Sequence, residues 1–106
     1  MSSFYKTTKL TSDTEVIFKR SNTSTSFADY PSNAQVSCSG LGLGTFDVYI
    51  LPCGESLFKS HILGATQDDT VMIAGKDAPL FDQIKVVFND NAGDVIATLT
   101  TWERGL

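Results

Sequence analysis

Residues 83–102 read QIKVVFNDNAGDVIATLTTW, and this stretch decides the fold class. Two runs with apolar side chains at alternate positions, 83–89 and 94–102, flank the turn-forming segment Asp90-Asn91-Ala92-Gly93. Alternation with a period of two is typical of a β-strand that has one buried face. Two such runs around four turn residues predict an antiparallel hairpin whose strands share one apolar face.

Parity gives the expected register of this hairpin. Pairing Asn89 with Asp94 produces an entirely apolar inner face, made of the pairs Phe88–Val95, Val86–Ala97 and Ile84–Leu99. On the opposite face Val87 stands across from Ile96, and Trp102 lies on the same side. We therefore expect Val87, Ile96 and Trp102 to form an exposed apolar strip.

The rest of the chain has the same pattern of short apolar runs separated by turn residues. Five further runs lie at 14–19, 34–39, 45–51, 57–63 and 70–74. Serine and threonine are abundant, and no segment has a helical period. The pattern predicts an all-β domain, a single antiparallel β-sandwich of about seven strands that is Ig-like or jelly-roll-like.

The first residues do not fit this alternation. Residues 1–13 are mostly polar and contain one aromatic pair, Phe4 and Tyr5. We expect an extended N-terminal arm over 1–13 and the β-sandwich domain over 14–106, with a long loop at 21–33.

Composition excludes several classes of function. The chain has 106 residues, 42% of them hydrophobic and 19% charged, and a net charge of −4. A doubly wound nucleotide-binding fold needs a longer chain, and no apolar run is long enough to span a membrane. The acidic balance argues against a nucleic-acid partner, which favours a basic face. The N-terminus lacks the apolar core of a signal peptide, which predicts folding in a cytoplasm.

No residue pattern indicates catalysis, a cofactor or a metal. A hairpin around Pro52-Cys53-Gly54-Glu55-Ser56 places His61 opposite Asp47, which is an ordinary surface pair. Cys53 lies in a turn without a helix N-terminus to activate it. The spacing of Cys38, Cys53 and His61 differs from that of structural zinc ligands. We expect two free thiols, with Cys38 buried and Cys53 exposed, because a predicted pairing of 36–39 with 45–48 separates them by about 20 Å.

The glycine-rich segment 40–45 reads GLGLGT, and it does not match a phosphate-binding loop. It precedes an expected strand instead of opening a helix. We interpret it as a strand connection in which glycines supply positive φ angles.

From Ala34 to Trp102 the chain resembles small β-sandwich structural proteins of tailed bacteriophage particles. These are head decoration or cement subunits and modules appended to neck and tail proteins. The resembling segments are Gly44 to Leu51, the 52–56 turn, the aromatic-centred Leu57-Phe58-Lys59, and the two runs 84–88 and 95–99. Similar proteins carry an Asp-Gly-Gly-like turn at the 52–56 position, which only Gly54 matches here.

The resemblance implies a non-enzymatic virion protein, a capsid decoration or cement subunit assembled in the cytoplasm of a bacterial host. Its partners are then the major capsid or tail protein of the same particle and other copies of itself, with a trimer favoured. The residues that fit a partner interface are Phe4, Tyr5, Val87, Ile96 and Trp102, although the arm or the 21–33 loop, with Phe27 or Tyr30, can equally cover this face.

A second class of function is a neck-associated, tail-associated or fibre-borne module that binds carbohydrate. Trp102, Tyr30 and Tyr49 are its candidate stacking platforms. A third class, a small hydrolase, is disfavoured because Cys53, His61 and a carboxylate do not form a recognisable nucleophile motif.

Overall fold

The computed structural model describes residues 4–12, 14–19, 33–73, 81–89 and 94–102. It contains eight β-strands, which are β1 (Phe4–Thr11), β2 (Glu15–Lys19), β3 (Asn33–Ser39), β4 (Thr45–Pro52), β5 (Lys59–Ala65), β6 (Val71–Ile73), β7 (Phe81–Asn89) and β8 (Val95–Trp102). No helix in the described part of the chain is long and apolar enough to cross a membrane.

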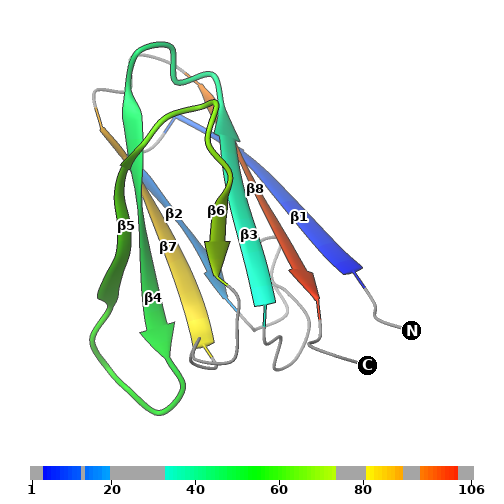
Figure 1. Ribbon diagram of the computed structural model, residues 1–106, viewed down its shortest axis with the longest axis vertical. Coiled ribbons are helices and arrows are strands. Elements are labelled where there is room, and N and C mark those ends of the chain that lie inside the picture. Colours follow the sequence, from blue (N-terminus) through cyan, green and yellow to red (C-terminus); the bar gives the residue numbers. More distant parts are fainter. Residues whose placement is uncertain (1–3, 13, 20–32, 74–80, 90–93, 103–106) are drawn as a thin grey trace.

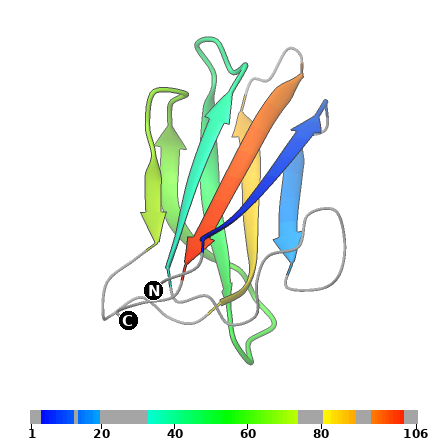
Figure 2. The same ribbon diagram turned by 90° about the vertical axis from the view of Figure 1, so that its right-hand side faces the viewer.

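The strands form two antiparallel four-stranded sheets, which confirms the predicted β-sandwich (Figure 1). Sheet I has the order β1-β8-β3-β6, and sheet II has the order β2-β7-β4-β5. Figure 2 shows β1, β8 and β3 of sheet I lying across β7 and β2 of sheet II. Apart from the β4–β5 hairpin, each described strand is followed along the chain by a strand of the other sheet.

The core lies between the two sheets. Inward residues alternate with outward ones along β4 and β7, as the period-two pattern requires. The largest fully buried apolar side chains of the core come from both sheets: Phe18, Phe46, Phe81, Ile73, Ile84, Leu99, Val36, Val48, Val86 and Val95. All seven predicted apolar runs correspond to strands β2–β8.

The predicted arm is wrong for residues 4–11. These residues form β1, which pairs with β8 along its whole length from Phe4↔Trp102 to Thr11↔Val95. The apolar alternation is absent because β1 is an edge strand whose register places Lys9 and Thr11 on the side of the core. Thr11 is buried and Leu10 is 60% exposed, the reverse of the usual pattern.

The predicted 83–102 hairpin is also wrong, because β7 and β8 lie in different sheets. β7 is hydrogen-bonded to β2 and β4, whereas β8 is hydrogen-bonded to β1 and β3. The alternation of odd and even positions nevertheless predicted the inner face of each strand correctly. Ile84, Val86 and Phe88 are buried, and so are their predicted partners Val95, Ala97 and Leu99. Two apolar faces can meet across a sandwich as well as within one sheet, and parity does not distinguish the two arrangements.

The β4–β5 hairpin exists, but its register differs from the predicted one. Ile50 pairs with Lys59 and Val48 with Ile62, with irregularities on both sides of Val48. Gly64 has φ +77° and its N–H donates to Oδ1 of Asp47 at 2.8 Å. A bulge of this kind adds residues to one strand. A register counted from the turn therefore assigns the wrong partners beyond the bulge.

Candidate functional site

The predicted apolar strip of Val87, Ile96 and Trp102 does not exist as one surface. Val87 lies on β7 in sheet II, where its strand partners are Glu15 and Asp47. Ile96 lies on β8 in sheet I, between Leu10 and Ser39. The two residues therefore face solvent on opposite sides of the sandwich, which follows directly from the separation of β7 and β8 into different sheets.

The structure brings together some of the other predicted interface residues. Phe4 and Trp102 are backbone partners at the end of the β1–β8 pair, and Tyr5 is the partner of Thr101. The side chains of these aromatic residues lie outside the described part of the structure. Trp102 shares the parity of Ile96 along β8, whereas Tyr5 pairs with a position whose side chain is fully buried.

The outer face of sheet I is free of charge among the side chains that the structure describes there. Its rows follow from the strand registers, and the register also places Lys6 beside Thr100. We give the name neutral face to the residues in these rows whose side chains the structure describes: Leu10, Ile96 and Ser39; Thr8, Thr98 and Ser37; Thr100, Gln35 and Met72. Leu10 is 60% exposed and its neighbour Ile96 is 40% exposed. Leu10 was not among the predicted interface residues. The signal for it in the sequence is that Leu10 is the one aliphatic residue of 4–11.

The outer face of sheet II carries charge instead. Glu15, Lys19, Asp47 and Lys85 occupy its outward positions. Nζ of Lys85 lies 5.0 Å from the centre of the Tyr49 ring and 4.6 Å from that of Phe58. These are cation–π distances, so Lys85 holds two aromatic rings against the surface of the sheet.

The predicted carbohydrate platforms do not converge. Tyr49 lies in sheet II and Trp102 in sheet I, while Tyr30 is outside the described residues. The predicted Asp47–His61 pair is wrong as well. Asp47 accepts a hydrogen bond from Gly64, and His61 instead donates from Nε2 to the carbonyl oxygen of Met72 at 2.7 Å.

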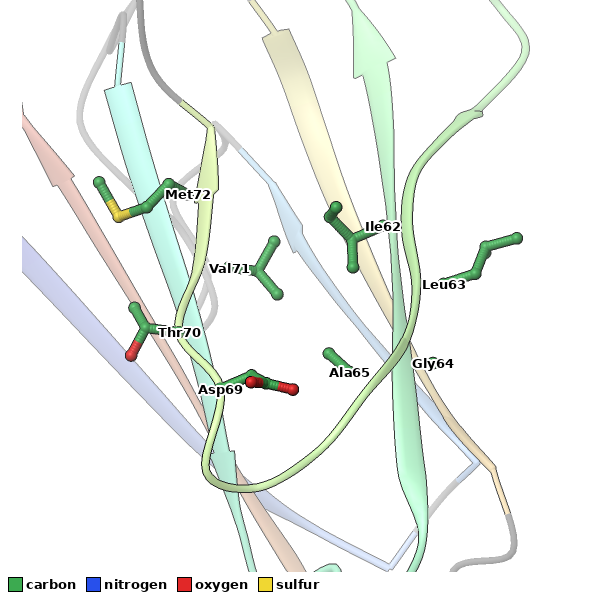
Figure 3. Close-up of a pocket in the computed structure, with 8 residues that line it drawn as sticks. All are labelled: Ile62, Leu63, Gly64, Ala65, Asp69, Thr70, Val71 and Met72. Atoms are coloured by element: carbon green, nitrogen blue, oxygen red, sulfur yellow. The ribbon is translucent and has the colours of Figure 1, made fainter.

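A groove lies beside the His61–Met72 bond, between the edge strands β5 and β6 (Figure 3). Its volume is about 350 Å³, and it is lined by Ile62, Leu63, Gly64, Ala65, Asp69, Thr70, Val71 and Met72. The predicted register sets His61 opposite Asp47 on the outer face, so the next residue, Ile62, falls on the closed inner face, and no groove is expected there. The separation of β5 and β6 into different sheets is what opens the core there.

The thiols are free, as predicted, with Cys38 buried and Cys53 exposed. The predicted pairing of β3 with β4 is nevertheless wrong, since they belong to different sheets. Burial raises the pKa of the Cys38 thiol to about 12. Sγ of Cys53 lies 3.4 Å from Oδ1 of Asp82. Within the described ranges, no group of three or more His, Cys, Asp and Glu side chains is placed to hold a metal ion.

No family model, curated protein or solved structure matches the chain.

Proposed function

We propose that this protein is a non-enzymatic structural subunit of a tailed-phage particle, a decoration or cement protein that binds the assembled shell. The observation that carries the proposal is the neutral face of sheet I, with Leu10 and Ile96 exposed side by side. In this proposal the partner is the major capsid or tail protein, copies of the chain associate as a trimer, and assembly takes place in the bacterial cytoplasm.

The strand orders 1-8-3-6 and 2-7-4-5 support the proposal at the level of the fold. An eight-stranded double sheet with this connectivity is a jelly roll. The sequence pattern left two architectures open, Ig-like and jelly-roll-like, and we take the second. Jelly rolls serve in viral capsid and lectin domains, so the topology agrees with shell binding and with carbohydrate binding alike. Because one fold serves both functions, the residues on its surface must decide between them.

The distribution of charge favours a partner on sheet I. The chain has a net charge of −4, so two acidic surfaces of this kind repel each other. The neutral face holds no acidic side chain, and the residue that borders it by register, Lys6, is basic, so this repulsion is absent on that side of the molecule. Its hydroxyl and aliphatic side chains are cheap to take out of water compared with ionised groups. A many-copy shell protein needs such a face toward its neighbours, while charge on sheet II keeps the opposite side hydrated.

The experiment that tests this function starts from the genes beside this one. Shells assembled from a neighbouring major capsid gene are mixed with the purified protein and pelleted, and the bound protein is quantified against shells of an unrelated phage. Saturable binding to the matched shells alone supports the proposal. Absence of binding, or a gene neighbourhood without capsid and tail genes, contradicts it.

A second candidate function is carbohydrate binding, which the Tyr49 and Phe58 rings beside Lys85 favour. Aromatic rings on an exposed sheet are stacking surfaces for sugars. A glycan array probed with the protein and with Tyr49→Ala separates this candidate from the first. Glycan binding that the substitution abolishes assigns the function to sheet II.

A further inference from the structure

The groove between β5 and β6 is a surface that neither proposed function uses. β5 ends sheet II and β6 ends sheet I, so two sheet edges meet at this side of the sandwich. Figure 3 shows the side chains of Ile62, Ala65 and Val71 facing the gap from its two walls. Leu63 and Met72 turn away from the gap on either side.

The floor of the groove is an opening into the apolar core. Ile62 pairs with Val48, whose side chain is completely buried, so its register belongs to the inner face of sheet II. Ile62 is nevertheless 41% exposed, while Ala65 and Val71 beside it are buried. Each Å² of apolar surface left in water costs about 25 cal/mol, so this position favours an occupant with an aliphatic side chain.

The polar groups that line the groove determine which charge a bound molecule should carry. Asp69 is the one charged residue among the eight that line it. Its Oδ2 accepts hydrogen bonds from the backbone N–H of Thr66 at 2.8 Å and from the Thr66 hydroxyl at 3.1 Å, which holds the carboxylate in place. Figure 3 shows this carboxylate turned into the gap. A cationic group is therefore favoured at this end of the groove.

The edge of β5 provides the backbone contacts. β5 pairs with β4 on one side, and no described strand pairs with its other side. Six of its seven residues are exposed. An edge with unpaired N–H and C=O groups is a template for an added strand.

We propose that this groove binds an extended peptide segment of a partner protein, added as an antiparallel strand to β5. Alternate side chains of a strand point to the same face, so two aliphatic residues at spacing two lie over Ile62. Because β5 runs toward Asp69, an antiparallel segment begins beside Asp69, and a lysine or arginine two residues before the first aliphatic residue pairs with its carboxylate. The recognised pattern is cation-x-aliphatic-x-aliphatic. This inference does not depend on the proposed function.

The probe that tests it is the blocked pentapeptide acetyl-KTVTV-amide, titrated to millimolar concentration into ¹⁵N-labelled protein. Two matched probes separate the contributions: acetyl-ETVTV-amide reverses the charge, and acetyl-KTSTS-amide removes the aliphatic side chains. We expect the first peptide to shift the backbone resonances of residues 61–65 and 70–72. Acetyl-ETVTV-amide is expected to bind at least about threefold more weakly because it loses an exposed ion pair. Acetyl-KTSTS-amide is expected to bind at least about threefold more weakly because it buries less apolar surface.

Two variants locate the binding. Asp69→Asn keeps an oxygen to accept from Thr66 but loses the charge. Ile62→Thr keeps the branch at Cβ but replaces the ethyl group of the side chain by a hydroxyl. Both are expected to weaken binding of acetyl-KTVTV-amide about threefold or more, whereas Asp68→Asn, on the same turn, leaves it unchanged. Equal affinity for the three peptides, shifts outside this edge, or binding unaffected by both variants overturns the proposal.

Discussion

His61 joins the two sheets at their open edge, because its Nε2 donates a hydrogen bond to the carbonyl oxygen of Met72 at 2.7 Å. β5 carries the ring and β6 the carbonyl, so the bond spans from sheet II to sheet I. β6 is three residues long and pairs with β3 alone among the described strands. This side-chain bond therefore adds a link to sheet II to the restraints that β6 has from β3 and from the buried Val71 and Ile73.

Removing this bond should loosen β6 more than it destabilises the whole fold. We expect His61→Ala to lower the free energy of unfolding by about 0.5–1 kcal/mol, as for one hydrogen bond, and to speed hydrogen exchange of the 71–73 amides. Urea denaturation and exchange by NMR measure the two effects. His61→Gln, which retains an N–H donor, is the control and should recover part of the protection. Unchanged exchange at β6 in the alanine variant contradicts the role of the bond.

The two cysteines should differ strongly in reactivity. Cys38 is buried and its raised pKa of about 12 keeps the thiol protonated, so we expect one reactive thiol per native chain at pH 8, that of Cys53, and two after unfolding. Titration with a thiol reagent counts them. Cys53→Ser should leave no fast-reacting thiol in the native state. Two equally fast thiols in the native protein would falsify the buried position of Cys38.

The same pKa predicts a dependence of stability on pH. The thiol of Cys38 has an ordinary pKa of 9.0, and burial raises it to about 12. A raised pKa favours the folded state fully below pH 9, and this contribution is lost as the pH rises toward 12. Between pH 8 and pH 10 the wild type should lose on the order of 1 kcal/mol more than Cys38→Ala. Parallel curves for the two proteins in denaturant melts contradict the assignment.

Thr101 offers a test of a buried polar group. Its side chain is fully buried, and its Oγ1 has no hydrogen-bond partner within the part of the chain that the structure describes. Thr101→Val keeps the shape and removes the unsatisfied hydroxyl, so we expect it to raise the free energy of unfolding by about 1 kcal/mol. Thr98→Val, a half-exposed position on the same strand, should change stability by less than about 0.5 kcal/mol. Destabilisation by Thr101→Val would show that the hydroxyl is satisfied in solution.

The glycine connection after β3 contains a position where space, as well as φ, requires glycine. Gly40 has φ +86°, and a Cβ there would lie 2.6 Å from the carbonyl oxygen of Asp94. Gly54 has a similar φ of +80°, but no atom of the described residues lies within 4 Å of its Cβ position. Gly54→Ala is expected to cost about 1–2 kcal/mol from backbone strain, and Gly40→Ala about 3 kcal/mol or more because a clash is added. Equal losses of stability for the two variants contradict this difference.

The positive φ angles at Gly40 and Gly42 agree with the interpretation of the glycine-rich segment as a strand connection. More widely, period-two alternation located β2–β8 because each of them has apolar side chains on its inner face, although Ala65 is the one buried residue of β5. It missed β1, whose inner register holds Lys9 and Thr11. Alternation reports which side chains are buried, and β1 at the sheet edge buries few.

Which strands are neighbours could not be predicted in the same way. Val86 and Ala97 are both buried whether their strands lie side by side or face each other across the core, so the sequence pattern is identical. The candidate sites depended on that choice. Placing β7 and β8 in different sheets separated Val87 from Ile96, joined Ile96 to Leu10, and accompanied the opening at Ile62.

The proposed shell interface can now be tested by substitutions on the two outer faces of the sandwich. Leu10 and Ile96 are paired neighbours on the neutral face, 60% and 40% exposed, and Val87 is a half-exposed aliphatic residue on sheet II. Leu10→Ser with Ile96→Ser should weaken binding to matched shells by at least about tenfold, since each of these side chains loses on the order of 1 kcal/mol of apolar burial in the interface. Because both side chains already contact water, the unfolding midpoint in urea should change little.

Val87→Ser is the matched control, because it removes a similar aliphatic group from the opposite face and should leave shell binding unchanged. Pelleting with shells measures affinity, and light scattering after size-exclusion chromatography reports the expected self-association. If Val87→Ser weakens binding and the double variant does not, the interface lies on sheet II, beside Lys85 and Tyr49. If neither changes binding, both outer faces are eliminated and the sheet edges, the β5–β6 groove among them, are the surfaces left to contact the shell.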